Sequence, residues 1–186
     1  MSEKKVIRPT TALYPVPAVL VTSYSEGMKP NIITIAWTGV MNSEPPVVYV
    51  GVRPGRHSHK LIKKSGDYCI NIPSADQVKI LDYCGMVSGS KVDKFAKTGL
   101  TPLPATIISA PLIEQCPVNM ECKVINSMFL GTHEIFIAEV MALHVNENIL
   151  KENGSLNAAS LQAFGYCMGE YRTVGEKIGA HGFSKK

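Results

Sequence analysis

The chain contains many short apolar runs, rich in Val, Ile, Thr and Tyr, that are separated by Pro, Gly or Ser. Runs of this kind and length are typical of β-strands. We expect short strands in the first half and a long antiparallel pair farther on, over residues 16–24, 31–40, 46–53, 67–73, 118–131 and 132–145. The pattern therefore predicts a mainly β protein.

Two segments have helical rather than alternating spacing. Residues 57–66 and 75–86 carry apolar side chains about three or four positions apart, as Val78 and Leu81 are. Because helices are few and connections short, we expect an antiparallel barrel or sandwich, since a parallel sheet needs more crossover helices. Without a repeat or a linker, residues 1–186 are expected to form a single domain. We expect the glycine-rich tail from Asn153 to wrap a surface or a partner subunit.

The composition narrows the functional classes. With 45% hydrophobic and 18% charged residues, the chain has the balance of an ordinary globular protein. The net charge of +4 comes without a long basic run, so nucleic-acid binding is not expected. There is no apolar run of membrane-spanning length and no clear cleavage site near the N-terminus, so we expect no membrane association and a cytoplasmic location. The 5 cysteines include no C-x-x-C pair and predict free thiols.

Cationic and hydrogen-bonding residues gather where the third predicted strand ends and the first helix begins. Arg56, His57 and Ser58 fall at the expected start of that helix, after the flexible Gly55. A helix N-terminus offers unpaired N–H groups to an anion, and an arginine fork suits phosphate oxygens. Two interpretations remain open, a phosphate site and an ordinary solvated helix face.

A metal site at the same junction is not predicted. His57 and His59 are two positions apart, and at a helix start their rings diverge. No cysteine or carboxylate stands nearby at ligand spacing.

From Thr11 to Tyr171 the chain resembles the flavin reductase-like, FMN-binding split-barrel family, and most closely its flavoredoxin branch. The resemblance depends on the order of several short motifs, namely NIITIAW, PPVVYVGVRPGRHSHKLI, SGDYCINIP, SGSKVDKF, MECKV and GTHEIFIAEV. It implies a mainly β (α+β) fold, a six-stranded Greek-key split barrel with short flanking helices. It also implies a homodimer that holds FMN in a groove near the subunit interface.

The resemblance also implies which residues bind FMN. The isoalloxazine ring would be lined, largely through backbone groups, by the segment that contains Asn31, Thr34, Ile35, Ala36, Trp37 and Thr38. The strand end at Gly51, Val52 and Arg53 would lie close to the ring. Arg56, His57 and Ser58 match the phosphate clasp. Ser88, Gly89 and Lys91 match a loop that closes over the phosphate or ribityl side, although a polar turn leading into a helix explains this loop equally well.

Four aromatic residues, one of them in the ring segment, are candidates by resemblance. His133 matches a histidine near the flavin and the nicotinamide, and is the candidate catalytic residue; the alternative is a half-buried, hydrogen-bonded histidine. Trp37 is either beside the flavin or an ordinary core aromatic. Tyr171, like Tyr166, either reaches toward the neighbouring subunit's flavin or packs on the surface. Cys84 is expected to be a buried, unreactive thiol.

The resulting hypothesis is an FMN-dependent oxidoreductase that receives electrons from NAD(P)H or a protein donor and passes them to an acceptor that the sequence does not identify. Because no G-x-G-x-x-G follows a strand, a nicotinamide would have to bind over the flavin without a Rossmann domain. One alternative is a non-enzymatic FMN-containing electron carrier or storage protein. Another is a basic binding module without a cofactor.

Overall fold

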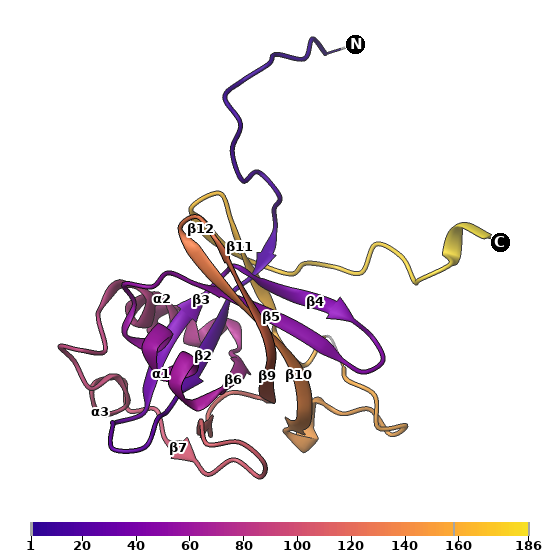
Figure 1. Cartoon of the computed structure of the whole chain (residues 1–186). Helices are drawn as coiled ribbons and strands as arrows, with labels where there is room; N and C mark the ends of the chain where they lie inside the picture. The colour runs from indigo at the N-terminus through magenta and orange to yellow at the C-terminus, as the bar shows by residue number, and fades with distance from the viewer. Residues whose placement is uncertain (1, 158, 186) are drawn as a thin grey trace.

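One curled antiparallel sheet dominates the computed structural model, which describes residues 2–157 and 159–185 (Figure 1). Its strands are arranged in the order β3-β2-β6-β9-β10-β5-β4. They are β2 (Val19–Ser23), β3 (Asn31–Ile35), β4 (Thr38–Asn42), β5 (Val47–Val52), β6 (Asp67–Ile72), β9 (Val118–Leu130) and β10 (His133–Val145). The expected mainly β, antiparallel architecture is confirmed, including the long β9–β10 pair.

The predicted continuous strand over 31–40 is wrong, because the chain breaks at Ala36 and Trp37. β3 pairs with β2, and β4 pairs with β5, so these consecutive strands form the two opposite edges of the sheet. The edges nearly meet, since the Gly51 N–H donates to the Trp37 carbonyl over 2.7 Å. If β3 and β4 are taken as one interrupted strand, the curled sheet is the six-stranded barrel that the resemblance implies. The interruption is where that barrel is split.

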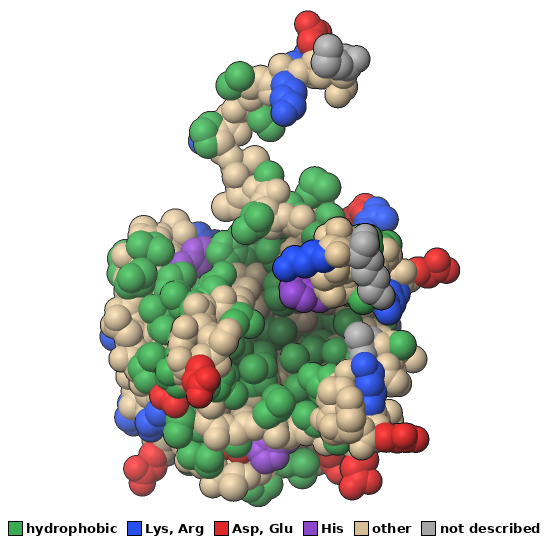
Figure 2. All heavy atoms as spheres, turned by 90° about the vertical axis from the view of Figure 1, so that its right-hand side faces the viewer, with side chains coloured by type: hydrophobic (Ala, Val, Ile, Leu, Met, Phe, Trp, Pro, Cys, Tyr) green, Lys and Arg blue, Asp and Glu red, His purple; other side chains and the backbone are tan. Residues whose placement is uncertain are grey.

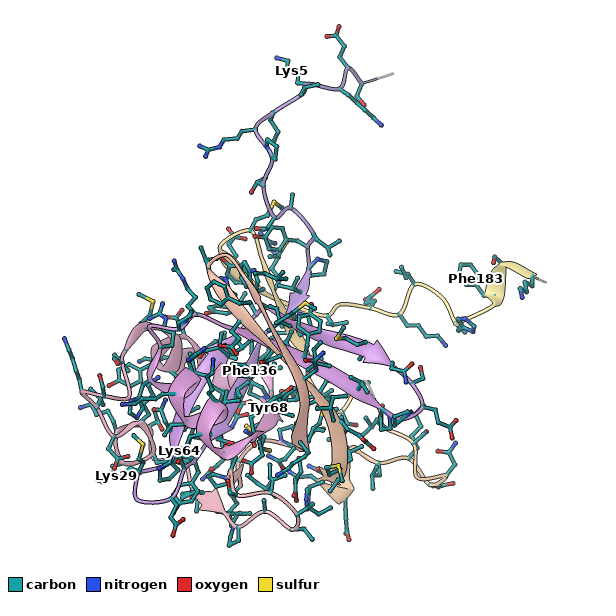
Figure 3. The ribbon with its side chains drawn as sticks, viewed as in Figure 1. Lys5, Lys29, Lys64, Tyr68, Phe136 and Phe183 are labelled. Atoms are coloured by element: carbon teal, nitrogen blue, oxygen red, sulfur yellow. The ribbon has the colours of Figure 1, made fainter. Side chains whose placement is uncertain are left out.

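The barrel interior is filled by apolar side chains from its strands and from one helix. Figure 3 shows Tyr68 and Phe136 near its centre, and both are buried, at 0% and 2% exposure. The Tyr68 hydroxyl donates to the Phe136 carbonyl over 3.3 Å, so this buried phenol keeps a partner. Ile62 joins the same cluster from outside the sheet. The barrel is therefore a packed core rather than a ligand cavity.

Short helices cover the side of the barrel that carries β2 and β3 (Figure 1). They are α1 (His57–Ser65), η1 (Ala75–Gln77), α2 (Val78–Met86) and α3 (Lys94–Thr98). Both predicted helices are confirmed, the second beginning with the 3-10 turn η1. In α1, Leu61 and Ile62 are buried while Lys63 and Lys64 are exposed, which is the amphipathic pattern that the sequence indicated. Gly66 then ends the helix with a left-handed φ of 72°.

The tail forms a second small sheet with the start of the chain. It consists of β1 (Val16–Pro17), β11 (Phe164–Cys167) and β12 (Glu170–Thr173), in the order β1-β11-β12. The tail thus packs against its own subunit through residue 173, and the two chain ends extend away from the barrel (Figure 1). The remaining elements are β7 (Pro102–Leu103), β8 (Leu112–Ile113), η2 (Glu147–Ile149) and η3 (Phe183–Lys185).

A buried carboxylate holds the loop that follows β7. Glu121 is 0% exposed, and its carboxylate accepts the backbone N–H groups of Thr106, Ile107 and Ile108 over 2.7, 2.7 and 3.0 Å. His144 Nε2 lies 2.6 Å from the same carboxylate. Although burial opposes ionisation, these hydrogen bonds keep the pKa of Glu121 below its ordinary value. The loop is therefore held in place by the Glu121 carboxylate, whose hydrogen-bond partners come from the chain itself.

Candidate functional site

A cleft of about 360 Å³ opens at the split in the barrel, between β3, α2, β10 and the β11–β12 hairpin. The residues predicted from the sequence that line it are Thr34, Ile35, Ala36, Trp37, Gly51, Arg53, Arg56, His133 and Tyr171. They come from four separate parts of the chain. The fold therefore brings most of the residues predicted for the ring site, the candidate catalytic histidine and the tail aromatic to one place.

Two aromatic rings stand side by side at the cleft. Trp37 and His133 stack with their ring centroids 6.1 Å apart and an angle of 2° between the ring planes. Trp37 is 42% exposed, so the interpretation of this residue as a core aromatic is wrong. Burial, and then the charge of Arg53, lower the pKa of His133 below its ordinary value, which favours a neutral imidazole near pH 7.

A narrow recess beneath the first turn of α1 lies next to the cleft. The recess is lined by Asn31, Ile33, Arg56, His57, Gly85, Val87, Ser88, Gly89 and Lys94. Ile33, Arg56 and Gly85 also line the cleft, so the two spaces adjoin. The two loops that were assigned to phosphate, at the start of α1 and at Ser88–Gly89, therefore meet around one recess.

Asn31 joins these two loops. Its side-chain N–H donates to the Ser58 hydroxyl over 2.8 Å, and Ser58 is 0% exposed behind the recess. On the other side, Gly89 lies so close that a Cβ there would be 2.0 Å from the Asn31 Oδ1. Only glycine fits at this position without moving Asn31. The shape of the recess is thus fixed by a core strand rather than by loop residues alone.

Lys94 is a residue of the recess that the sequence reasoning missed. Its ammonium is buried and donates to the carbonyls of Ile32 and Cys84, each over 2.6 Å. Desolvation on burial lowers the pKa of Lys94 to about 8. The signal available in the sequence was a lysine directly before an aromatic residue, Phe95.

The electrostatics of the recess favour an anion. Arg56 and Lys94 both line it, and none of its described lining residues is acidic. His57 Nδ1 is buried and has no hydrogen-bond partner in the described part of the chain. Burial, together with Lys60 and Lys94, lowers the pKa of His57. A buried polar atom without a partner beside two cations is the arrangement that an oxygen-rich anion would complete.

Four predicted residues lie outside both the cleft and the recess. The Thr38 hydroxyl donates to the Tyr49 carbonyl over 2.6 Å. Val52, the last residue of β5, points its side chain into the core, where it is 1% exposed. Ser58 is buried behind the recess, and Lys91 is exposed. Lys94, rather than Lys91, supplies the ammonium group of the recess.

The far wall of the cleft comes from the tail of the same chain. The Tyr171 hydroxyl donates to Asp82 Oδ1 on α2 over 3.0 Å, and its ring packs at 5.9 Å against Tyr166. Burial and then Asp82 raise the pKa of Tyr171 to about 12, so the phenol stays protonated. Asp82, Gly85 and Met86 line the cleft but were not predicted. Their helical spacing, three and four positions from Asp82, was the available signal.

Thiol and metal chemistry find little support here. Cys84 is 0% exposed, and burial raises its pKa to about 11, which is consistent with an unreactive thiol.

Within residues 2–157 and 159–185, no group of three or more His, Cys, Asp or Glu side chains is placed to hold a metal ion. None of the helices described is long and apolar enough to cross a membrane.

Known proteins share this architecture. Residues 11–175 match the family model described as "Flavin reductase like domain". The flavoredoxin of Desulfovibrio vulgaris (Miyazaki F) is 33% identical, with a TM-score of 0.92 over 99% of this chain and 100% of that one. A flavoredoxin from Methanosarcina acetivorans is 30% identical, with a TM-score of 0.92 over 100% of this chain and 98% of that one.

A curated relative is also similar in sequence. An uncharacterized protein of Archaeoglobus fulgidus is 30% identical over 150 residues, which are 81% of this chain and 82% of the relative. The resemblance inferred from the ordered motifs is thereby confirmed, and so is the split-barrel fold. The chain belongs to the flavin reductase-like domain family.

Proposed function

We propose that this protein is an FMN-dependent oxidoreductase that receives electrons from NAD(P)H or a protein donor and delivers them to an acceptor still to be identified. The observation that carries the proposal is that an aromatic-walled cleft adjoins a cationic recess, with which it shares Ile33, Arg56 and Gly85. A flat ring system bearing a phosphate on a flexible chain matches both parts. Bound flavin would supply the hydride- and electron-transfer chemistry.

The recess residues suit the phosphate end of FMN. Arg56 would direct its guanidinium at the phosphate oxygens, and the first-turn N–H groups of α1 would add donors. Lys94 would contribute its ammonium, and Ser88 its hydroxyl. A phosphate oxygen would also give His57 Nδ1 the partner that the described chain does not provide.

The cleft residues suit the ring. Ala36 and Trp37 fall between the β2–β3 and β4–β5 registers; the Trp37 carbonyl accepts the Gly51 N–H, but the backbone N–H groups of both residues lie outside the two ladders. Their N–H groups would hydrogen-bond to the polar edge of the ring and favour an electron-rich state. Trp37, His133 and Tyr171 would bound the ring with aromatic surfaces. His133, held neutral by its surroundings, would position a nicotinamide rather than repel it.

Anaerobic reduction of the purified protein tests this proposal. We expect a yellow protein whose colour is bleached by NADH or NADPH. A yellow protein that neither nucleotide bleaches, but that a chemical reductant does, would support the alternative of an FMN-containing carrier or store. A colourless protein that takes up no FMN would contradict both and leave the cofactor-free binding module.

Trp37 provides a separate report on the ring position. It is the only tryptophan, so the indole emission of the protein comes from one known place. Titration of FMN into apoprotein should quench that emission, because a flavin ring within a few ångströms accepts energy or an electron from the indole. Unchanged emission on FMN binding would exclude Trp37 from the ring site.

We further propose that the protein is a homodimer. Figure 2 shows a hollowed face covered by hydrophobic side chains. A groove in the β4–β5–β10 region includes Val40, Met141 and Leu143, which are 78%, 42% and 52% exposed. Apolar surface of this kind is costly in water and is typical of subunit contacts. Sedimentation of the wild type as a dimer and of Leu143→Asp as a monomer would support this; a wild-type monomer with flavin bound would contradict it.

A further inference from the structure

The first turn of α1 has no capping side chain of its own. Arg56 stands at the N-cap position, but within the described residues its side chain makes no capping hydrogen bond, and the turn contains no acidic residue. A capping side chain normally accepts one of the free N–H groups and so helps to fix the start of a helix. The proposed function assigns these N–H groups to the FMN phosphate, so their position has to be set by contacts with other elements.

Two buried polar contacts supply that support from neighbouring residues of the turn. The Ser58 hydroxyl accepts the side-chain N–H of Asn31 on β3 over 2.8 Å. His59 Nε2 lies 2.7 Å from Glu134 Oε2 on β10, and His59 and Glu134 are only 8% and 6% exposed. The His59 ring also packs edge-on against Phe136, with the ring centroids 5.4 Å apart. The turn is therefore tied to two strands of the barrel.

The Glu134 carboxylate has further partners that keep it charged. Lys63 Nζ lies 3.2 Å from Oε2, and the Ser127 hydroxyl donates to Oε1 over 3.0 Å. Although burial opposes ionisation, the hydrogen bonds from His59, Lys63 and Ser127 lower the pKa of Glu134 below its ordinary value. Since His59 and Lys63 are four positions apart on α1, one carboxylate holds two successive turns of the helix.

Glu134 does not itself border the space assigned to FMN. It lines neither the cleft nor the recess. It follows His133 directly on β10, and successive side chains of a strand point to opposite faces, so His133 faces the cleft while Glu134 faces α1. Its negative charge would also repel a phosphate in the recess rather than attract it. Any favourable effect of Glu134 on phosphate binding must therefore act through the helix.

We propose that Glu134 is a positioning residue for the FMN phosphate: through His59 it holds the first turn of α1 where the N–H groups of the turn meet the phosphate oxygens. The inference rests on the proposed function. Hydrogen bonds weaken steeply when their donors are misdirected, and a binding site depends on the contacts that hold its donors in place. A small shift of the turn should therefore reduce the affinity for the phosphate and leave the affinity for the ring unchanged.

Two neutral variants of Glu134 separate positioning from charge. Glu134→Ala removes the carboxylate and leaves His59 without its acceptor, whereas Glu134→Gln removes the same charge but keeps an oxygen that can accept the His59 N–H. Glu134→Ala should weaken FMN binding to apoprotein about 5- to 20-fold and riboflavin binding less than about twofold. The FMN affinity of Glu134→Gln should lie closer to that of the wild type. Fluorescence titration of both flavins measures these affinities.

Two further variants test the route through His59 and the effect of charge alone. His59→Phe keeps a ring against Phe136 but removes the nitrogen, so it should weaken FMN as Glu134→Ala does. Combining the two substitutions should cause little further loss, because residues in one contact do not act additively. Glu139→Gln removes the same charge from the same strand, outside the cleft and the recess, and should change neither affinity.

Other results would contradict the inference. If the two Glu134 variants bind FMN with the same affinity, or more tightly than the wild type, the contact with His59 does not position the turn. If Glu134→Ala weakens FMN and riboflavin equally, Glu134 supports the fold and not the phosphate site. Failure of the wild-type apoprotein to bind either flavin would refute the proposed function instead. In that case, weaker binding of inorganic phosphate to Glu134→Ala than to Glu134→Gln would still support the positioning of the turn, and equal binding would contradict it.

Discussion

Two clusters of polar groups in this protein differ in how their charge is satisfied. The Glu121 carboxylate receives three backbone N–H groups and lies 2.6 Å from His144 Nε2. In the recess, Lys94 donates to two carbonyls, but the described lining residues include no carboxylate to balance the charges of Lys94 and the exposed Arg56, and His57 Nδ1 has no partner. The first cluster is complete within the chain. In the second, the two positive charges and His57 Nδ1 have no counterpart until an anion is added.

The difference separates a structural site from a binding site. Burying an ion without partners costs several kcal/mol, so folded chains normally supply those partners themselves. Where they do not, and the group borders a space, a ligand is the simplest compensation. We therefore expect substitutions at Glu121 to reduce stability, and substitutions in the recess to reduce ligand affinity.

Glu121→Gln should have the largest effect, on folding. An amide cannot replace the charge that meets three N–H groups and His144, so we expect a loss of about 3 kcal/mol in the free energy of unfolding. Urea denaturation of the apoprotein measures it. Since hydrogen bonds lower the folded-state pKa of Glu121, its contribution should be present at neutral pH and disappear as the pH falls through that pKa. A variant as stable as the wild type would show that the Glu121 carboxylate does not stabilise the fold.

Arg56→Ala should act on binding instead of folding. Loss of one charge-assisted contact to phosphate corresponds to about 1.5–3 kcal/mol, or roughly 10- to 150-fold weaker FMN binding. Riboflavin lacks the phosphate, so its affinity should hardly change, and the preference for FMN should largely collapse. Higher salt should weaken FMN binding to the wild type more than to the variant.

Fluorescence titration of both flavins into apoprotein measures the effect of Arg56→Ala. Lys64→Ala is the matched control, since it removes an exposed cation from the last turn of the same helix. It should leave both affinities unchanged. If Arg56→Ala weakened the binding of FMN and of riboflavin equally, Arg56 would support the fold or the binding of the isoalloxazine ring, and not the binding of the phosphate.

Lys94→Met should weaken FMN by roughly 10- to 30-fold near neutral pH, because it removes a buried cation of the recess. Since the pKa of Lys94 is about 8, FMN affinity of the wild type should fall as the pH rises through that value, and the variant should lack this fall. Stability should show the opposite trend. Between about pH 8 and pH 10.5, Lys94 is protonated to a larger extent in the unfolded chain than in the folded one. The wild-type apoprotein should therefore gain stability as the pH rises through this range. Parallel pH profiles of FMN affinity for wild type and variant would contradict the assignment.

His133→Ala should have the smallest effect on the flavin itself. If the His133 imidazole positions the nicotinamide, kcat/KM for NAD(P)H should fall about tenfold while FMN affinity changes little. Steady-state kinetics and flavin titration on the same preparation separate the two quantities. His181→Ala, in the exposed tail, is the control. A comparable loss of both quantities would make His133 a structural residue.

Local patterns predicted much of the fold and part of the candidate site. Apolar runs rich in Val, Ile, Thr and Tyr, bounded by Pro, Gly or Ser, indicated the strands, although β5 and β6 are buried at nearly every position and only β10 shows a clear alternation. The amphipathic spacing of α1 fixed the helix, and the cluster around Arg56 at its start indicated an anion. Strands, the amphipathic helix and the cationic cluster each depend on residues that are close together in the chain, so they can be predicted from the sequence.

Only the tertiary structure decided which side chains share a space. Lys91 and Lys94 are equivalent in the sequence, yet one is exposed and the other is buried between the carbonyls of Ile32 and Cys84. The break at Ala36 likewise follows from the curling of the sheet. β3 pairs with β2 and β4 pairs with β5, so these two consecutive strands lie at opposite ends of the strand order. Both outcomes depend on contacts between residues far apart in the chain, and periodicity within a segment carries no information about those contacts.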